Sequence, residues 1–297
     1  MTVVEVDGRQ VALSSLDKVL WPETGFTKRQ LLDYYERVAP VLLPHIRDRP
    51  LTLGRFPDGV DGPGFAQNEC RGRPEWVATQ PIRLKSGIVR HYCVVNDLPS
   101  LLWVANLGTI ELHPYLAPGA RREHPLALVL DLDPTPPAGL TECRSVALRA
   151  REALDAIGLR SLAKTSGAAG LHVFVPLDGD ARFSETKAFA RRLAETVEQE
   201  MPELVVTTQS KATRAGKVLV DWLQNDPMRS TVAPYSLRAT QRPQVSTPVG
   251  WAEVEAGASA VFDPEQVLDR VERLGDLFRP VLELRQSLPA SASLPTT

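Results

Sequence analysis

The amino-acid sequence predicts a mixed α/β fold. Apolar stretches that end in acidic residues have the character of buried strands, and they alternate with segments of helical periodicity. With 43% hydrophobic and 24% charged residues, the composition is that of an ordinary globular protein. A chain of 297 residues can bury a substantial core, either as one large domain or as two closely packed lobes.

The first expected elements are a hairpin and a helix. Residues 3–14 alternate apolar and polar side chains around Asp7-Gly8, which is typical of a β-hairpin. Thr27 and Gln30 have the spacing of a capping box, which satisfies two backbone N–H groups at a helix start. A helix is therefore expected after Thr27, with a buried stripe of Leu31, Leu32, Tyr35, Val38 and Leu42.

The next part of the chain alternates loops and strands. Residues 50–75 are rich in glycine, proline and arginine, and predict a long loop with short strands. Residues 77–115 are strand-like, with a short helical stretch near 99–108. The apolar run at 126–133 predicts a buried strand, which the proline-rich sequence after it terminates.

Helices and strands continue to alternate after this run. A helix is expected at about 142–157, with Thr141 as its cap and Gly158 just past its end. A strand, a turn and a second strand are expected within 164–177, followed by a helix at about 185–200.

The last elements are a strand and a helix. A second apolar strand is expected at 217–224, and the last helix starts at Asp263-Pro264, a cap followed by proline in the first turn. The tail at 286–297 is small and polar, and we expect it to be disordered.

Composition limits the partner and the compartment. The formal net charge is −2, so any binding to a nucleic acid depends on local basic patches. No apolar run approaches the roughly 20 residues of a membrane helix, and the N-terminus lacks an export signal. Cys70, Cys93 and Cys143 are odd in number and widely spaced, which argues against a disulfide framework and a zinc site. We expect a protein of the reducing cytoplasm with no membrane partner.

Three aspartates suggest a metal site. Asp131 and Asp133 lie two positions apart on a predicted strand, so their side chains share one face at about 7 Å along the backbone. Such carboxylates repel each other, and a divalent cation relieves that cost. Asp221 ends another apolar strand, and if the two strands are neighbours, three carboxylates can hold two Mg²⁺ or Mn²⁺ ions. The alternative is a strand end with solvated acids.

The turn within residues 164–177 fits a phosphate group. Its sequence, TSGAAG, supplies small residues through which backbone N–H groups can approach phosphate oxygens closely. Ser166 and His172 can add side-chain donors. The alternatives are an ordinary glycine-rich hairpin and a hydrogen-bonded core histidine.

These residues come in the order and spacing of a known family. The chain resembles the archaeo-eukaryotic primase superfamily in three motifs: Asp131-Leu132-Asp133-Pro134, then Thr165-Ser166-Gly167 with Gly170-Leu171-His172, and Asp221-Trp222 with Gln224-Asn225. More closely, it resembles the polymerase domain of bacterial ligase D over nearly its whole length. The resemblance implies a two-lobed fold whose second lobe carries a sheet like that of an RNA-recognition motif. It divides the chain into a primase-polymerase domain at 1–285, with lobes at about 1–120 and 121–285, and a tail.

The resemblance also implies a function. The chain would be a metal-dependent nucleotidyltransferase that adds NTPs or dNTPs to the 3′-hydroxyl of a DNA primer, gap or break end. Asp131, Asp133 and Asp221 would bind two Mn²⁺ or Mg²⁺ ions. Its implied partners are DNA with a primer, gap or 5′-phosphate, nucleoside triphosphates, and the end-joining proteins Ku and a DNA ligase.

Further residues match the family's contacts with its substrates. Lys18 and Lys28 match lysines that grip a DNA 5′-phosphate, an interaction that salt weakens. Phe65 matches one of two aromatic residues that stack on the template. The positions that match contacts with the incoming nucleotide are Ser166, His172, Gln224, Arg238 and His113.

The chain departs from the family pattern at two positions. The second aromatic residue of the template-stacking pair is Ala66 here, which weakens the expected stacking. Ala169 stands where the family commonly has a lysine, so a contact with a phosphate is expected to be lost. The length leaves no room for ligase or nuclease domains, so we expect a stand-alone member or one domain of a larger protein.

Two other functions fit parts of the sequence. The run LVLDLDPT also matches the DxDxT pattern of haloacid-dehalogenase-type phosphatases, although that motif normally lies near the N-terminus. A degenerate relative that only binds DNA ends is the second alternative, and Ala66 and Ala169 favour it. Against it, three carboxylates without metal ions would repel DNA.

Overall fold

A computed structural model describes residues 1–257, 259 and 261–289, which form two compact units. Unit 1 comprises residues 1–120, 230–246 and 262–275. Unit 2 comprises the described residues of 121–229, 247–261 and 276–297. Unit 1 thus adds two later segments to the N-terminal lobe that the sequence predicts. We describe each unit by itself.

Unit 2 is built on a six-stranded sheet with the strand order β13-β14-β10-β12-β11-β17. The strands are β10 (Ala127–Pro134), β11 (Leu162–Thr165), β12 (Leu171–Pro176), β13 (Val205–Val206), β14 (Val218–Asp221) and β17 (Pro248–Val249). One helix follows β10 and another follows β12, which is the split βαββαβ arrangement of the RNA-recognition motif. The predicted fold class is confirmed.

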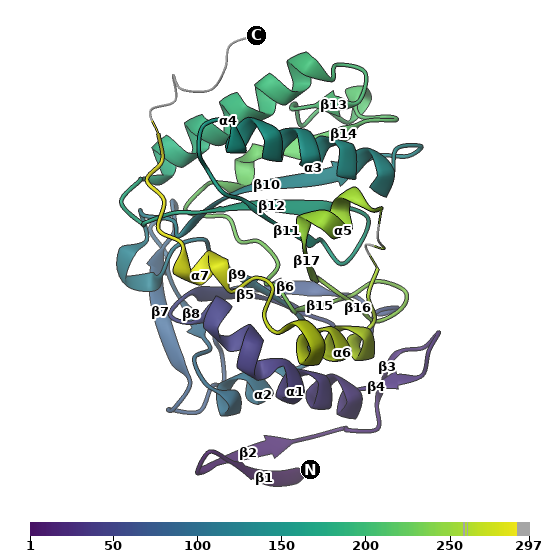
Figure 1. Cartoon of the computed structure of the whole chain (residues 1–297). Coiled ribbons are helices and arrows are strands. Elements are labelled where there is room, and N and C mark those ends of the chain that lie inside the picture. The colour runs from purple at the N-terminus through teal and green to yellow at the C-terminus, as the bar shows by residue number, and fades with distance from the viewer. Residues whose placement is uncertain (258, 260, 290–297) are drawn as a thin grey trace. The chain divides into compact units, whose positions relative to one another are not determined.

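Two long helices lie side by side on one face of this sheet (Figure 1). The helices of unit 2 are α3 (Leu140–Asp155), α4 (Phe183–Glu200), α5 (Trp251–Glu255) and α7 (Pro280–Glu283). Short 3₁₀ turns occur at Gly119–Arg121, Lys211–Thr213 and Trp222–Gln224. On the other face, Phe278 packs edge-on against Phe174 of β12, with 5.1 Å between ring centroids. The residues of β10 alternate between the two faces, so Asp131 and Asp133 lie opposite the long helices.

Some predicted boundaries in unit 2 are wrong. The cap of α3 is Gly139 and not Thr141, because Glu142 reaches back to accept a hydrogen bond from the Gly139 N–H at 2.7 Å. The same device, with Glu185 and the Arg182 N–H, starts α4 at Phe183. Helix α7 was not predicted, because four residues are too few to show a period.

Unit 1 contains a five-stranded sheet and three two-stranded hairpins. In the sheet the order is β6-β5-β8-β7, and β9 also pairs with β5. Its strands are β5 (Pro50–Arg55), β6 (Phe65–Gln67), β7 (Ala78–Arg83), β8 (Val89–Val94) and β9 (Thr109–Pro114). The hairpins are β1–β2 (Thr2–Val6, Arg9–Leu13), β3–β4 (Val19–Trp21, Phe26–Thr27) and β15–β16 (Leu237–Arg238, Gln244–Val245). The expected hairpin around Asp7-Gly8 is confirmed.

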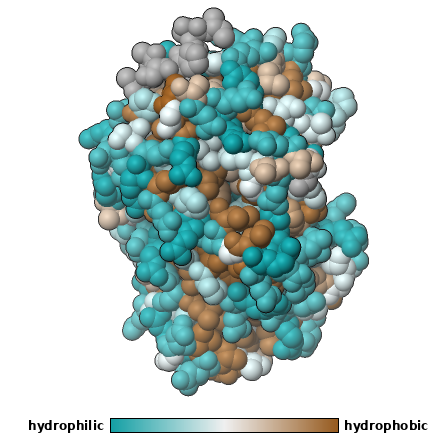
Figure 2. All heavy atoms as spheres, viewed as in Figure 1, coloured by the Kyte–Doolittle hydropathy of each residue, from teal (hydrophilic) through white to brown (hydrophobic). Residues whose placement is uncertain are grey.

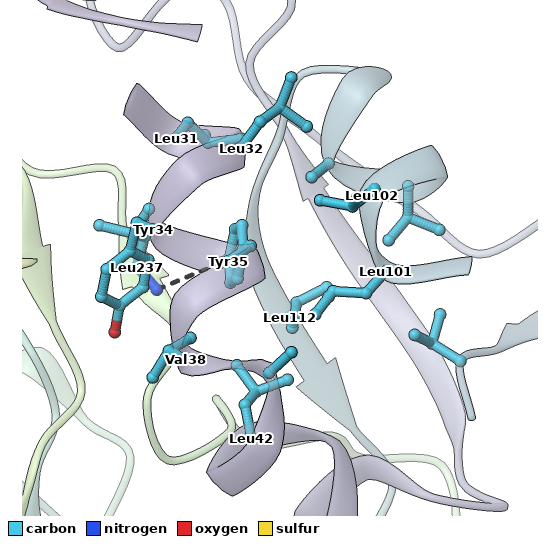
Figure 3. Close-up of a cluster of buried hydrophobic side chains, with 14 of the residues drawn as sticks. Leu31, Leu32, Tyr34, Tyr35, Val38, Leu42, Leu101, Leu102, Leu112 and Leu237 are labelled. Carbon is cyan, nitrogen blue, oxygen red and sulfur yellow. Dashed lines mark hydrogen bonds between the residues drawn. The ribbon is translucent and has the colours of Figure 1, made fainter. Parts of the chain in front are cut away.

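The core of unit 1 lies between its helices and its sheet. The helices are α1 (Lys28–Ile46), α2 (Leu98–Asn106) and α6 (Pro264–Leu274). The capping box of Thr27 and Gln30 is present, and so is the cap at Asp263. Figure 3 shows the predicted stripe of α1 packed against Leu101 and Leu102 of α2 and Leu112 of β9. The Tyr35 hydroxyl within this core accepts a hydrogen bond from the Leu237 N–H at 3.3 Å (Figure 3).

The prediction against a disulfide is wrong. Cys70 and Cys93 are joined by a disulfide bond, with 5.0 Å between their Cα atoms. The Cys70 N–H donates to the His91 carbonyl of β8 at 2.7 Å, which lays the loop after β6 along that strand. The sequence separation of 23 residues gave no sign of this contact. Cys143 is buried as a free thiol in α3.

The visible face of the molecule carries mostly hydrophilic residues with hydrophobic ones between them (Figure 2). Among the described residues, no helix is both long and apolar enough to cross a membrane. The predicted tail lies outside the described residues from position 290 onward. Its first residues are ordered, since Gln286 binds the backbone of Arg160, Pro176 and Asp178, and Ser287 donates to the Asp178 carboxylate at 2.7 Å.

Candidate active site

The acidic residues of unit 2 share one face of its sheet. Strand β14 pairs with β10, as the metal-site hypothesis requires, and Asp221 lies directly opposite Asp131. On the other side of β10, His172 of β12 lies opposite the same residue, and its Nε2 is 3.1 Å from Asp131 Oδ1. Asp133 projects from the same face two residues along β10. The sheet thus brings together four of the predicted site residues.

Mutual repulsion affects two of these carboxylates. The pKa of Asp133 is raised by burial and by the charge of Asp131, and Arg214 offsets part of the effect. The pKa of Asp221 is raised by burial and by Asp131, although the hydrogen bond from the Leu223 N–H acts in the opposite direction. Carboxylates that share a face raise one another's pKa, and such groups of acids are typical of a cation-binding site.

Two glutamine side chains contact the acids in the structure, and one of them lies between Asp131 and Asp221. The Nε2 of Gln224 lies 3.4 Å from a carboxylate oxygen of Asp131 and 3.3 Å from one of Asp221. Gln209 donates to the other oxygen of Asp221 at 3.1 Å, and Arg214 donates in turn to Gln209. The sequence singled out Gln224, but it missed Gln209 and placed Arg214 only within a basic stretch.

The acids are aligned but not gathered around a point. Within residues 1–257, 259 and 261–289, no group of three or more His, Cys, Asp or Glu side chains is close enough to hold a metal ion as it stands. The donor set nevertheless fits Mg²⁺ or Mn²⁺, because it consists of carboxylate oxygens whose repulsion a cation would relieve. A shift of the Gln224 amide would free one oxygen on each of two carboxylates.

The turn between β11 and β12 is closed by Ser166. Its hydroxyl oxygen accepts hydrogen bonds from the N–H groups of Ala168 and Gly170, at 3.2 and 3.0 Å. A Cβ atom at Gly170 would lie 2.1 Å from the Leu132 carbonyl oxygen, so only glycine lets the turn pass this close to β10. Ser166 therefore shapes the turn, and Ala169 offers no side-chain donor beside it.

Asn225 was part of a quoted motif but had no predicted role. Its side chain is fully buried, donates to the Val129 carbonyl at 2.7 Å and accepts from the Val129 N–H at 2.9 Å. Strand β14 ends at Asp221, which pairs with Asp131, so the Asn225 amide continues the ladder to Val129 of β10 where the strand has ended. The Trp222–Gln224 turn is fixed in this way, because Asn225 also donates to the Trp222 carbonyl.

The remaining predicted residues belong to unit 1, where Lys18 and Lys28 are neighbours. The Lys28 N–H donates to the Lys18 carbonyl at 2.9 Å across the ends of the β3–β4 hairpin. Lys18 pairs with Asp58 at 2.7 Å, and Lys28, only 6% exposed, donates to the Ser14 carbonyl. Burial and the charges of Lys18 and Arg55 lower the pKa of Lys28 to about 8. This basic cluster lies at the N-terminus of α1, where anions are favoured.

Phe65 begins β6 and is 48% exposed, an unusual position for a phenylalanine. Arg55 lies opposite it on β5, with the guanidinium carbon 5.3 Å from the ring centroid. An exposed ring beside a cation is suited to stacking on a base. Ala66 next to it is also exposed, so the predicted stacking position holds a single aromatic ring.

His113 and Arg238 lie together in unit 1. Both contact the carboxylate of Glu111, His113 through Nε2 at 2.8 Å and Arg238 through Nε at 3.0 Å. The sequence singled out the histidine and the arginine, but not the glutamate between them.

Comparison with known proteins places this arrangement in a family. The family model described as LigD, primase-polymerase domain, matches residues 27–278. The chain belongs to the LigD primase-polymerase family. It is 39% identical over 278 residues to the multifunctional non-homologous end joining DNA repair protein LigD of Mycobacterium tuberculosis, a match that covers 91% of the chain and 36% of that protein. It is 30% identical over 288 residues to the bifunctional non-homologous end joining protein LigD of Bacillus subtilis, with 96% of the chain and 46% of that protein covered.

A solved structure agrees with this membership. The polymerase domain of Mycobacterium tuberculosis ligase D in complex with DNA superimposes with a TM-score of 0.87 and 37% identity, covering 93% of the chain and 99% of that domain. The chain spans 36% to 46% of the length of these curated LigD relatives. Membership of the LigD primase-polymerase family confirms the prediction of a DNA-directed nucleotidyltransferase at the level of the family. It excludes the DxDxT phosphatase alternative.

Proposed function

We propose that this chain is a divalent-metal-dependent nucleotidyltransferase that adds NTPs or dNTPs to the 3′-hydroxyl of a DNA primer, gap or break end. The row of Asp221, Asp131 and His172 across three neighbouring strands, with Asp133 on the same face, carries the proposal. A protein that only binds DNA has no use for three carboxylates that repel it and one another.

The acids of unit 2 are assigned to catalysis. Asp131, Asp133 and Asp221 would hold two Mg²⁺ or Mn²⁺ ions. When bound, such ions lower the pKa of an attacking hydroxyl and neutralise a leaving pyrophosphate. His172 contacts Oδ1 of Asp131. The other oxygen of Asp131 would then point along the row toward Asp221. Gln224 is positioned by Asn225 and the 3₁₀ turn to contact the nucleotide. We assign no protein general base.

The predicted residues of unit 1 are assigned to binding. Lys18 and Lys28 grip the 5′-phosphate at the far side of a gap, and Phe65 stacks on the template base. His113 and Arg238 bind the phosphates of the nucleotide. We propose Ku and a DNA ligase as partners, because the relatives are named as non-homologous end joining proteins, and the cytoplasm is the compartment in which we place this activity. The Cys70–Cys93 bond would be largely reduced there.

Extension of a labelled primer on gapped DNA tests this function. With Mn²⁺ or Mg²⁺ we expect nucleotides to be added opposite the template, and more rapidly when the gap carries a 5′-phosphate. Chelation should stop incorporation but leave binding to the 5′-phosphorylated gap, because the lysines that grip it need no metal. Retained DNA binding with no incorporation under any metal condition would support the degenerate end-binding protein instead.

The lowered pKa of Lys28 predicts a pH dependence of 5′-phosphate binding. Lys28 is positively charged below a pKa of about 8 and neutral above it. The preference for phosphorylated over non-phosphorylated gaps should therefore decrease as the pH rises from 7 to 9, by at most about tenfold per pH unit for one lost proton. Lys28→Arg, whose side chain stays charged, should remove this dependence. An unchanged pH profile in that variant would mean that another group titrates.

A further inference from the structure

The Glu111 carboxylate is the common partner of two predicted nucleotide-binding side chains. Its Oε2 accepts from Nε2 of His113, and its Oε1 lies within 3.0 Å of both Nε of Arg238 and the backbone N–H of Ala239. The Glu111 side chain is 15% exposed, and those of His113 and Arg238 are each 22% exposed. Both carboxylate oxygens thus have partners within unit 1.

The alternation of β9 explains this placement. Ile110 and Leu112 point into the hydrophobic core and are 0% and 1% exposed, as Figure 3 shows for Leu112. Glu111 and His113 must therefore lie on the opposite face of the strand. Arg238 comes from the neighbouring segment, which is attached to β9 because the Leu112 N–H donates to Ser236 Oγ and the Ala233 N–H donates to the Leu112 carbonyl, each at 2.9 Å.

The neighbouring strand leaves room for the glutamate. Gly54 of β5 lies directly opposite Glu111. A Cβ atom at Gly54 would lie 2.8 Å from the Cβ and 3.3 Å from the Cγ of Glu111, closer than packed atoms tolerate. Any side chain at position 54 would displace the carboxylate from its three partners.

The electrostatics favour a permanently charged glutamate. Burial by itself would raise the pKa of Glu111, but the hydrogen bond from His113 and the charge of Arg238 outweigh it and lower the pKa to about 2. The carboxylate is therefore ionised at any working pH. Its ion pair holds the Arg238 guanidinium beside it, and its contact with Nε2 leaves Nδ1 as the ring nitrogen of His113 that is available to a ligand. Oriented donors of this kind bind phosphate more strongly than freely rotating ones.

We propose that Glu111 is a positioning residue that orients His113 and Arg238 toward the phosphates of a nucleoside triphosphate. This inference rests on the proposed function, because that function assigns both partners to the nucleotide. Glu111 does not touch the nucleotide itself, since its oxygens are engaged by hydrogen bonds from His113 and the Ala239 N–H and by the ion pair with Arg238. Its effect is on nucleotide affinity and not on the DNA 5′-phosphate, which a separate cluster of lysines binds.

The test is steady-state incorporation by Glu111→Gln, together with equilibrium binding of a fluorescent nucleoside triphosphate. Glutamine keeps the shape but loses the charge, and it cannot accept hydrogen bonds at both terminal positions. We expect the KM and the Kd for the nucleotide to rise about 10- to 100-fold with kcat changed less than about threefold. Affinity for the 5′-phosphorylated gap should change little. The unfolding midpoint should fall at neutral pH, because the lowered pKa means that the ionised carboxylate stabilises the folded state, so binding is measured at a temperature at which the variant stays folded. Gly54→Ala should reproduce the effect, and Glu272→Gln, an exposed residue on α6, should behave as wild type.

Each outcome separates this inference from the proposed function. An active wild type whose KM and Kd are unchanged in Glu111→Gln overturns the inference and leaves the function standing. A fall in kcat and in the unfolding midpoint at constant KM also overturns it, because it indicates a purely structural role. If the wild type binds nucleotide without incorporating it, the function fails, and the ratio of the two Kd values still decides the inference. A wild type that binds no nucleotide overturns both.

Discussion

Asp133→Asn is expected to lower nucleotide incorporation at least about 1,000-fold, equivalent to about 4 kcal/mol of transition-state stabilisation. The amide keeps the size of the side chain but loses the negative charge that holds a divalent ion. The side chain projects from the end of β10 and packs against no core, so the loss would reflect the site and not the fold. The measurement is single-nucleotide incorporation on a gapped template with saturating Mn²⁺.

The same variant should be at least as stable as the wild type at neutral pH. Burial and the charge of Asp131 raise the pKa of Asp133, so its ionised form opposes folding at any pH above the pKa of an unfolded aspartate. Replacement by asparagine removes this cost, and the gain should disappear in acid, where the wild-type carboxyl is protonated in both states. Glu203→Gln, at an exposed position of the same unit, is the matched control and should change neither activity nor stability. Full activity in Asp133→Asn would exclude this residue as a metal ligand.

Asn225→Leu is expected to have the largest effect on stability. Leucine has a similar volume, but it would leave both the N–H and the carbonyl of Val129 without their side-chain partners in a fully buried position. Each buried polar group left unsatisfied costs about 1–3 kcal/mol, so a loss of about 2–6 kcal/mol is expected for the two groups, measured by urea unfolding. Such a loss is a large share of the total of about 5–15 kcal/mol that is typical of a domain.

A graded variant separates the fold from the site. Asn225→Asp retains an acceptor for the Val129 N–H but has no donor for the carbonyls of Val129 and Trp222 when it is ionised. It should also reduce incorporation at temperatures at which the chain remains folded, because the turn that carries Gln224 is released. Wild-type stability in both variants would show that the amide does not extend the ladder of β10.

Much of the fold follows from local rules in the sequence. The capping box at Thr27 and Gln30 and the cap at Asp263 fix helix starts, because each depends only on residues within one turn. The two acidic strand ends were predicted separately, and the sheet confirms that their strands are neighbours. The helix starts that were predicted wrongly depend on a glutamate whose side chain accepts from the backbone N–H three residues earlier. At Gly139, for example, the capped residue has no side chain that could cap the helix itself.

The partners of the site residues could not be predicted in the same way. Glu111 and Arg238 are separated by more than a hundred positions, and only the packing of the later segment against β9 brings them together. The Cys70–Cys93 bond similarly depends on where a loop lies. The Asn225 side chain takes the place of a neighbouring strand beside Val129 of β10, and the hydrophobic periodicity of the sequence does not reveal such a contact. Motif spacing therefore predicts the residues of the site, whereas their supporting contacts depend on tertiary structure.

Binding of Mn²⁺ to the folded chain tests the central claim most directly, because the aligned acids must come together around ions if they are catalytic. The signal of free Mn²⁺ in electron paramagnetic resonance would be followed during titration of the wild type and of the triple variant Asp131→Asn, Asp133→Asn and Asp221→Asn, with and without a nucleoside triphosphate. We predict that the wild type removes up to two ions per chain from solution in the presence of nucleotide, beyond those that nucleotide alone binds, and that the triple variant does not. Equal binding by the two proteins would contradict the assignment of the metal site to these three aspartates.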